Sequence, residues 1–376
     1  MNDIYPAFLM PLLPLFVAKF GISLTLAGAL SAVLSTTSSL VQPLVGHLAD
    51  TSESRAFVVL GPAITALSMG MIGLATGPPM LVTLLAIGGV GCAMFHPQGA
   101  AMAGAIDHAR RGFLLSAFTT AGEAGYALGP LLVLSVVSTL GLRHTYLTIL
   151  PGILVALFIY YFAPPARVSC ATSQDLKNNG NGRLPVGPLT MLWLMAALRL
   201  CVSSGFTTFL PLYLKEMGLP LVAYGSVASM FLLAGTVGIM VGGPLADRVG
   251  AFRLLVIALV APIPLFLVFL NTSGLISYVF LAVAAAILSA PMPVITMAAQ
   301  NLAPGRAGTV SALMMGVAWG AGSLGVIGVG AIADALGIRM ALTFLLAALV
   351  AAAGLGYGLE ALVRRSPATQ PLLPLA

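Results

Sequence analysis

Long apolar stretches follow one another along almost the whole chain, and they limit the folds that it can adopt. A helix needs about 20 mostly apolar residues to cross the hydrocarbon core of a bilayer. Twelve stretches approach or exceed this length, with little polar sequence between most of them. We expect helices over 1–18, 24–48, 56–76, 79–105, 112–140, 144–163, 188–213, 221–246, 253–271, 274–300, 307–333 and 339–362.

The composition fits a chain that faces lipid rather than water. Of the 376 residues, 59% are hydrophobic and 7% are charged, and the mean hydropathy is +1.07. A soluble domain has roughly 25% charged residues, so this chain lacks the polar side chains to cover a water-facing surface. Barrels of outer membranes need short segments of alternating polarity, whereas these stretches are continuous and longer. The sequence therefore predicts an all-α, multi-pass membrane protein.

One internal segment, 164–187, is polar and rich in Gly and Asn, which is typical of a flexible linker. A second polar segment, 364–376, follows the last apolar stretch. We therefore predict a six-helix half at 1–163, a linker at 164–187, a second six-helix half at 188–363 and a tail at 364–376.

Basic residues are divided unequally between the two ends of the predicted helices. The side that holds the linker has eleven and the opposite side has four. Because cytoplasmic loops carry an excess of Lys and Arg, we predict that both termini and the linker are cytoplasmic, in the inner membrane of a bacterium. The basic residues are spread over six segments rather than one patch, which argues against nucleic acid as a partner. The eleven are Arg55, Arg110, Arg111, Arg167, Lys177, Arg183, Arg248, Arg253, Arg306, Arg364 and Arg365.

The two halves are related by a repeat at a single sequence offset of 197 residues. Both halves start on the same side of the membrane, so the repeat is parallel, with its axis along the membrane normal. Transporters use such repeats to rock one half against the other around a site between them. The matches join 12–16 to 209–213, Gly21 to Gly218, Gly28 to Gly225, Gly46 to Gly243 and 48–50 to 245–247.

The same offset carries an expectation about the start of the chain. The seventh helix is predicted to begin near Pro188, whose partner position falls about ten residues before Met1. We therefore expect a short first helix, or a native chain that begins upstream. Asn2 then corresponds to Arg199 across the pseudo-twofold axis.

A similar motif ends the second helix of each half. The first copy is Gly46-His47-Leu48-Ala49-Asp50 and the second runs from Gly243 to Arg253. Together they resemble the loop signature of the major facilitator superfamily, although 51–54 departs from the usual basic ending of the motif. The alternative is an ordinary polar loop. The resemblance implies two pseudo-symmetric six-helix halves and a conformational role for Gly46, Asp50, Gly243, Asp247 and Arg248.

Within that superfamily the chain resembles the fosmidomycin-resistance group of efflux proteins over nearly its whole length. Phe95-His96-Pro97 is the most specific match, while Gln98 and Glu123 depart from the residues expected there. The resemblance implies proton-coupled efflux of a small, anionic compound, such as a phosphonate-type antibiotic, by alternating access. The alternative is transport of another organic anion, metabolite or siderophore in either direction. The other matching stretches are Asn2-Asp3, 38–43, 235–244 and 302–306.

Four ionisable residues fall inside predicted helices and away from a clear helix end, where a charged group costs a few kcal/mol. They are Asp3, His96, Glu123 and Arg199. Transfer out of water disfavours the charged form of a carboxylate, so we predict that Glu123 or Asp3 carries a coupling proton. Arg offers a fork suited to phosphonate or carboxylate, so Arg199 and His96 are predicted to bind an anionic substrate. For Glu123 the alternatives are a static ion pair with Arg199 or a hydrogen bond to a neighbouring helix, and for His96 the alternative is a packed histidine.

Asn2, in the matching Asn2-Asp3 stretch, and Gln98, directly after Phe95-His96-Pro97, are further substrate-binding candidates. Gly122, Gly125, Gly129 and Pro130 share a face of the fifth helix and resemble the Gly-Pro signature of drug–proton antiporters. That resemblance favours export, while close packing of helices is the alternative explanation.

The sequence has no paired His/Glu metal motif, Gly-x-Ser-x-Gly or phosphate loop, so we predict that the protein is not an enzyme. Cys92, Cys170 and Cys201 have no paired spacing, so neither a disulfide nor a metal site is predicted. They are interpreted as small apolar packing residues. We expect no cofactor, a proton gradient as the energy source, and a monomer whose partners are a small molecule, protons and lipid.

Overall fold

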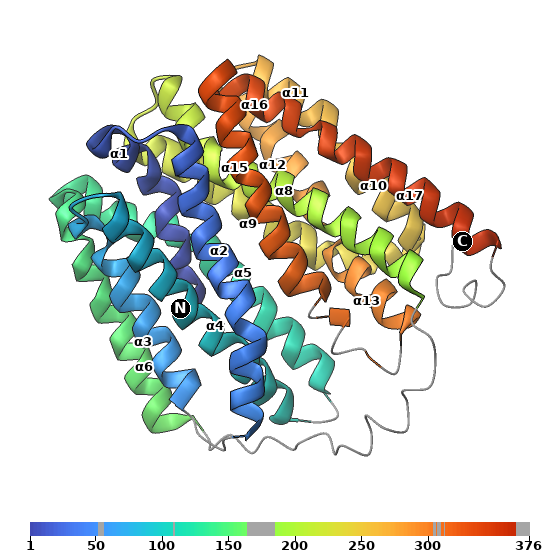
Figure 1. Ribbon diagram of the computed structural model, residues 1–376, viewed down its shortest axis with the longest axis horizontal. Coiled ribbons are helices and arrows are strands. Elements are labelled where there is room, and N and C mark those ends of the chain that lie inside the picture. Colours follow the sequence, from blue (N-terminus) through green and yellow to red (C-terminus); the bar gives the residue numbers. More distant parts are fainter. Residues whose placement is uncertain are drawn as a thin grey trace. The chain divides into compact units, whose positions relative to one another are not determined.

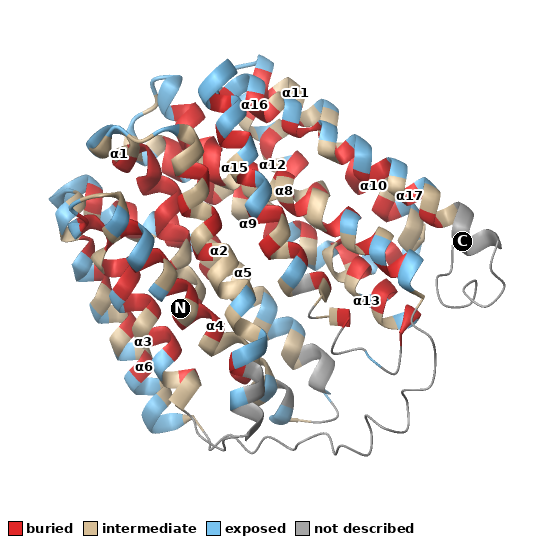
Figure 2. Cartoon of the chain, in the orientation of Figure 1, coloured by how far each residue is buried: buried red, intermediate tan, exposed pale blue. Residues whose placement is uncertain are grey.

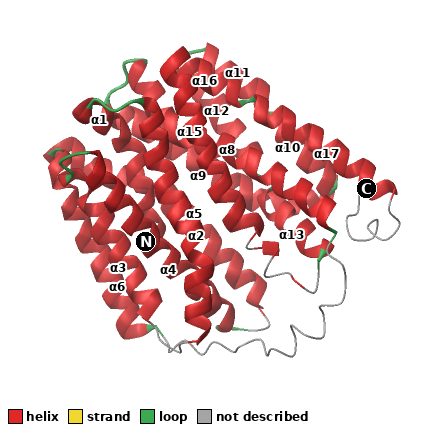
Figure 3. Cartoon of the chain, in the orientation of Figure 1, coloured by secondary structure: helices red, strands yellow, loops and turns green. Residues whose placement is uncertain are grey.

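The computed structural model describes residues 1–51, 56–107, 110–163, 185–303, 306, 310–311 and 313–365. These residues form helices and short connections, without a strand among them (Figure 3). Within this part of the chain, twelve helical segments are long and apolar enough to cross a membrane, which confirms the prediction. They are Asn2–Phe20, Leu24–Val45, Ala56–Leu74, Pro78–Ala103, Leu114–Leu140, Leu142–Phe162, Val186–Glu216, Leu221–Val249, Ala251–Asn271, Leu275–Leu302, Ala318–Leu336 and Ile338–Glu360.

Several of these segments consist of more than one helix (Figure 1). In the first half of the sequence the elements are η1 (Asn2–Ile4), η2 (Pro6–Phe8), α1 (Leu9–Phe20), α2 (Leu24–Thr51), α3 (Ala56–Gly70), η3 (Met71–Leu74), α4 (Pro78–Ala105), α5 (Arg111–Leu140), η5 (Leu142–Thr148) and α6 (Ile149–Phe162). In the second half they are α8 (Val186–Glu216), α9 (Leu221–Val249), α10 (Ala251–Val260), α11 (Pro262–Asn271), α12 (Leu275–Ser289), α13 (Met292–Leu302), the π-helical η7 (Leu313–Val317), α15 (Ala318–Leu336), α16 (Ile338–Leu345) and α17 (Ala347–Arg365).

Proline explains three of the divisions within the spans. Proline lacks a backbone N–H and clashes with the carbonyl of the residue four positions earlier, so it favours the start of a helix over its interior. Pro6 begins η2 and Pro262 begins α11, while Pro291 separates α12 from α13. Inside a membrane, neighbouring helices can satisfy the backbone groups that such breaks release. The divided spans therefore still cross as units.

The outer side of α6 shows how these helices meet lipid. Leu150, Leu154, Phe158 and Tyr161 recur at spacings of three or four residues and are all strongly exposed. Figure 2 shows the same division of helices into buried and exposed faces elsewhere in the chain. An apolar stripe of this size would be unfavourable in water, whereas it is suited to the hydrocarbon of a bilayer.

The described chain clusters into two compact units. Unit 1 comprises Met1–Ser169, Thr207–Leu233 and Val326–Ile338. Unit 2 comprises Cys170–Phe206, Ala234–Gly325 and Arg339–Ala376. Spatial contact, rather than position along the chain, defines these units, and the boundaries of the two six-helix halves stay a prediction. Most of the predicted linker 164–187 and of the predicted tail 364–376 lies outside the described residues.

Unit 1 contains a close junction between α2 and α15. The Asp334 carboxylate accepts hydrogen bonds from the backbone N–H groups of Leu24 and Thr25, at 2.8 and 2.9 Å, and from the Thr25 hydroxyl at 2.6 Å. These N–H groups begin α2 and have no partner within the helix, and a negative charge is favourable at a helix N-terminus. Gly28 lets the two backbones approach, because a Cβ there would lie 2.7 Å from the Val326 carbonyl oxygen.

The second copy of the loop motif ends α9. Gly250 has a φ of +91°, a conformation that glycine adopts without steric cost, and α10 starts at the next residue. Asp247 and Arg248 are exposed in the last turn of α9, while Gly243 is half-buried. In the first copy the backbone of Gly46 and Asp50 belongs to α2, but their side chains lie outside the described residues. The conformational role of both copies stays a prediction.

Candidate functional site

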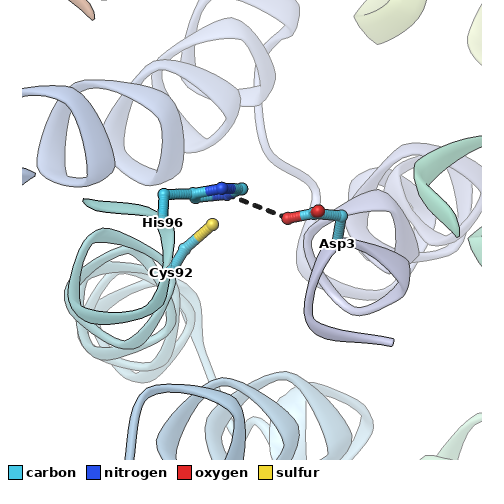
Figure 4. A group of neighbouring side chains, drawn as sticks. All are labelled: Asp3, Cys92 and His96. Atoms are coloured by element: carbon cyan, nitrogen blue, oxygen red, sulfur yellow. Dashed lines mark ion pairs between the residues drawn. The ribbon is translucent and has the colours of Figure 1, made fainter. Parts of the chain in front are cut away.

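An ion pair joins the first and fourth spans inside unit 1 (Figure 4). His96 Nε2 lies 2.9 Å from Asp3 Oδ1, and the two side chains are 31% and 16% exposed. Asp3 comes from η1 and His96 from α4. The pair thus lies within two apolar spans, yet neither side chain is sealed from its surroundings. A carboxylate and an imidazole at this distance can hold a proton between them or release it.

Asn2 belongs to the same cluster. It is 4% exposed, and its Nδ2 group donates to Asp3 Oδ1 at 3.4 Å and to Cys92 Sγ at 3.6 Å. Among the described residues, Asn2 Oδ1 has no hydrogen-bond partner. A buried polar atom without a partner costs about 1–3 kcal/mol, so the amide is held in the cluster with one oxygen unsatisfied.

Helix α4 supplies the opposite side of the cluster. Cys92 and His96 are four residues apart, which places both side chains on one face of the helix. Pro97 lies inside α4 directly after His96. The Phe95 ring packs against the His96 ring, at 5.9 Å and edge-on, and against the Phe118 ring at 5.9 Å. These contacts fix the direction in which the imidazole faces η1.

The glycines of α5 form the surface on which the first span rests. A Cβ at Gly122 would lie 2.7 Å from Asp3 Oδ2, and a Cβ at Gly129 would lie 2.7 Å from the Ala7 Cβ. A Cβ at Gly125 would instead make an ordinary contact with Ile4, at 3.5 Å. A Cβ at Gly129 would also overlap the Ile4 backbone carbonyl, so close packing requires glycine there, whereas a Cβ at Gly122 would displace the Asp3 carboxylate. An additional role of the predicted gate, including Pro130, stays a prediction.

These distances give a test with a matched control. We expect Gly122→Ala to destabilise the protein by about 1–3 kcal/mol relative to Gly125→Ala, because the new methyl group overlaps the Asp3 carboxylate. Both variants gain the same helix propensity, so their difference isolates the packing effect. Thermal unfolding in detergent measures it. Equal midpoints for the two variants would show that the Asp3 carboxylate does not need this space.

Two further predicted residues lie close by in the chain but face different surroundings. Glu123 follows Gly122 in α5 and is half-buried. Gln98 is 1% exposed, and its Oε1 accepts the backbone N–H of Val58 at 3.1 Å. This hydrogen bond ties α4 to α3, so the amide oxygen of Gln98 has a structural contact. Its predicted contact with substrate stays a prediction.

Arg199 lies in unit 2. Its side chain is 3% exposed, and Nη1 donates to the backbone carbonyl of Leu288 at 3.2 Å. The guanidinium borders a small recess of about 10 Å³, the space of roughly one water molecule. The recess combines one permanent positive charge with apolar, sulfur-containing and aromatic side chains. Its other lining residues are Ala196, Leu200, Met292, Ile295, Thr296, Met314 and Trp319.

The structure thus brings together Asn2, Asp3 and His96, and it adds Cys92 to them. The sequence alone indicates an apolar packing role for Cys92, although its four-residue spacing from His96 on one predicted helix places the two side chains on the same face. The Sγ atom, the His96 nitrogen and an Asp3 oxygen all lie within 4.8 Å of one another. Three atoms of different chemical types therefore converge on one point.

Comparison with known proteins gives matches along most of the chain. The model of the Major Facilitator Superfamily matches residues 7–326. A Bacillus subtilis protein described as the MFS-type transporter YfnC is 28% identical over 90% of this chain and 85% of its own length. The fosmidomycin resistance protein of Escherichia coli is 26% identical over the same shares, 90% and 85%.

A solved structure has the same fold. It is a bacterial homolog of the human lysosomal transporter Spinster, in an inward-facing and occupied conformation. It superposes with a TM-score of 0.81 at 17% identity and covers 97% of this chain and 96% of its own. At this level of identity the likeness concerns the fold alone.

Proposed function

Because the chain belongs to the major facilitator superfamily, and so is a membrane transporter rather than an enzyme, we propose that it exports a small anionic compound in exchange for protons. The proposal extends to a monomer in the inner membrane of a bacterium, with both termini cytoplasmic, as the distribution of basic residues favours.

The observation that carries the proposal is the ion pair between Asp3 and His96. Ionisable side chains inside membrane spans are costly and are characteristic of ion pathways. Removing one member of a desolvated pair leaves the other charge without compensation. Protonation of the pair is therefore linked to movement of η1 against α4, which is the kind of link that coupled transport requires.

Glu123 supplies a second carboxylate on α5, one residue from the glycine that packs on Asp3. A proton carrier must be accessible to water in one conformation and shielded from water in another, and the half-buried position of Glu123 fits this demand. We propose that Glu123 carries the coupled proton and that the Asp3–His96 pair responds to it. The alternative is that Asp3 carries the proton, and the variants Glu123→Gln and Asp3→Asn distinguish the two carboxylates.

We propose that the anionic group of the substrate binds to Arg199, at the small recess that the guanidinium borders. A guanidinium stays charged at every physiological pH and offers paired donors to a phosphonate or carboxylate. Trp319 and Met292 border the same recess, so the compound is expected to have an apolar portion as well. Gln98, Asn2 and His96 remain proposed contacts of the substrate at other stages of transport.

The direction of transport is proposed as export. The glycine stripe that ends in Pro130 resembles that of drug–proton antiporters, and the Escherichia coli relative is named for resistance to an antibiotic. Import of another organic anion, metabolite or siderophore is the competing function. The two functions differ in which face of the membrane takes up substrate when protons flow down their gradient.

Transport in oriented vesicles tests the proposal. Purified protein is reconstituted in liposomes, and uptake of labelled fosmidomycin, a phosphonate, is followed under an imposed pH gradient in right-side-out and inside-out preparations. We expect accumulation in inside-out vesicles with an acidic interior. Accumulation only when the exterior is acidic would show that substrate and protons move in the same direction, and would establish import. If fosmidomycin and simple phosphonates neither bind nor move, the substrate class is wrong.

A further inference from the structure

Four side chains from two spans converge inside unit 1, and their chemistry exceeds what an ion pair requires. Figure 4 shows Asp3, Cys92 and His96 turned toward one another, with Asp3 and His96 joined directly. The Asn2 Nδ2 group contacts Asp3 Oδ1 and Cys92 Sγ. We propose that Asn2, Asp3, Cys92 and His96 form a binding site for a borderline divalent cation of the Zn²⁺ class.

The separations of the ligand atoms support this assignment. In a tetrahedral zinc site the ligand atoms stand about 2.0–2.3 Å from the metal, which separates them from one another by roughly 3.3–3.6 Å. Here His96 Nε2 and Asp3 Oδ1 are 2.9 Å apart, and all three atoms with Cys92 Sγ lie within 4.8 Å. Small side-chain rotations therefore reach the required geometry. The spacing of Cys92 and His96 along α4 keeps two of the ligands in place during that adjustment.

Asn2 provides the fourth ligand and an independent observation. Its side chain is almost completely buried and turned into the cluster, and within the described part of the chain its Oδ1 has no hydrogen-bond partner. The oxygen and nitrogen of an amide occupy equivalent positions after a half-turn. Such a turn directs the unsatisfied oxygen at the cation in place of the amide nitrogen, which now contacts Cys92 and Asp3.

Charge balance also favours a divalent cation. Metal binding requires a thiolate, a carboxylate and a neutral imidazole, so it releases protons from these groups. The Asp3 carboxylate and the Cys92 thiolate then contribute two negative charges, which a divalent cation neutralises. A neutral cluster is the least costly state inside an apolar span.

The ligand set selects among divalent cations. Ca²⁺ and Mg²⁺ prefer six or more oxygen ligands and bind sulfur poorly. Sulfur and imidazole favour Zn²⁺ and its neighbours in the first transition row. A fourfold set of one sulfur, one nitrogen and two oxygens therefore fits Zn²⁺, and Co²⁺ as its spectroscopic substitute.

Occupancy of this site has a consequence that rests on the proposed function. The cation competes with protons for Asp3 and His96 and fixes η1 to α4, so it is expected to inhibit proton-coupled transport. Cation binding itself does not depend on transport. A direct binding measurement consequently separates failure of this inference from failure of the proposed function.

Cobalt titration of the full-length protein in detergent tests the inference. A background in which Cys170 and Cys201 are replaced by Ser keeps Cys92 as the one remaining cysteine. We expect Co²⁺ to produce a thiolate-to-cobalt absorption band in the near ultraviolet, with displacement by an equivalent of Zn²⁺ and no response to Mg²⁺. Cys92→Ser should abolish the band, and Asp3→Asn or His96→Gln should weaken binding by more than the roughly 10- to 100-fold that loss of an outer-shell partner costs.

The control variant is the Cys170/Cys201 background itself, which should bind Co²⁺ as the wild type does. Thermal unfolding of each variant without metal checks that it is folded, and Zn²⁺ should raise the midpoint of the wild type but not of Cys92→Ser. Absence of the cobalt band in the folded wild-type protein would overturn the inference. Persistence of the band in folded Cys92→Ser would overturn it equally.

Discussion

Replacing Glu123 with Gln should abolish pH-gradient-driven accumulation of substrate while substrate exchange at equal pH continues. Gln has nearly the same size and cannot release a proton, so the cycle loses the step that links substrate to the gradient. Accumulation should fall to the level of protein-free liposomes, and the exchange rate should stay within about twofold of the wild type, the size of effect expected where no substrate contact is removed. Both quantities are measured in the same proteoliposomes.

Two further variants make this result interpretable. Glu216 is an exposed carboxylate at the end of α8, and Glu216→Gln applies the same chemical change without an expected effect on coupling. Asp3→Asn removes the carboxylate of the ion pair with His96. Unchanged accumulation in Glu123→Gln, together with its loss in Asp3→Asn, would transfer the role of proton carrier to Asp3. Unchanged accumulation in both would remove the carboxylates from the mechanism.

Replacing Arg199 with Ala should nearly eliminate substrate binding. Truncation of a buried, hydrogen-bonded charge facing an opposite charge costs about 2–5 kcal/mol, which corresponds to a roughly 30- to 5,000-fold weaker affinity. Arg199→Lys keeps the charge but loses the paired donors, so its affinity should fall between that of the wild type and that of Arg199→Ala. Because Trp319 borders the same recess, ligand-dependent quenching of tryptophan fluorescence reports the binding.

Arg253 offers the matched control for this prediction. It belongs to unit 2 and is exposed on α10, so Arg253→Ala removes the same charge away from the recess. We expect its affinity to equal that of the wild type. An equal loss in both variants would indicate a general effect of charge, and unchanged binding in Arg199→Ala would exclude the recess as the anion site.

The twelve spans could be predicted from sequence because bilayer thickness sets a length that apolar stretches must reach. The positions at which helices break within a span are harder to predict from the sequence. Pro262 and Pro291 divide their spans, whereas Pro14 and Pro43 remain inside α1 and α2. Whether a proline breaks a helix in a membrane depends on neighbours that satisfy the released backbone groups, and a single sequence does not specify those neighbours.

The candidate site was predicted in its members but not in its arrangement. The cost of placing charges in hydrocarbon points to Asp3 and His96 from the sequence alone. The sequence predicts separate roles for them, as a proton carrier and a substrate contact, whereas the structure pairs them at 2.9 Å. They are far apart in sequence, and their contact depends on the irregular turns of η1 and on the α5 glycines. Cysteine is a common apolar packing residue, so the sequence alone does not single out Cys92. The structure does, because Cys92 lies close to Asn2 and Asp3 of η1.

The proton movement that accompanies transport tests most directly whether the protein exchanges its substrate for protons. Proteoliposomes with a trapped pH-sensitive dye receive an outward gradient of labelled phosphonate at equal pH on both sides. We expect substrate efflux to drive protons inward, so that the interior acidifies in the wild type and its pH remains unchanged in Glu123→Gln. Efflux of the phosphonate from wild-type proteoliposomes with no change of internal pH, in the absence of a protonophore, would contradict it.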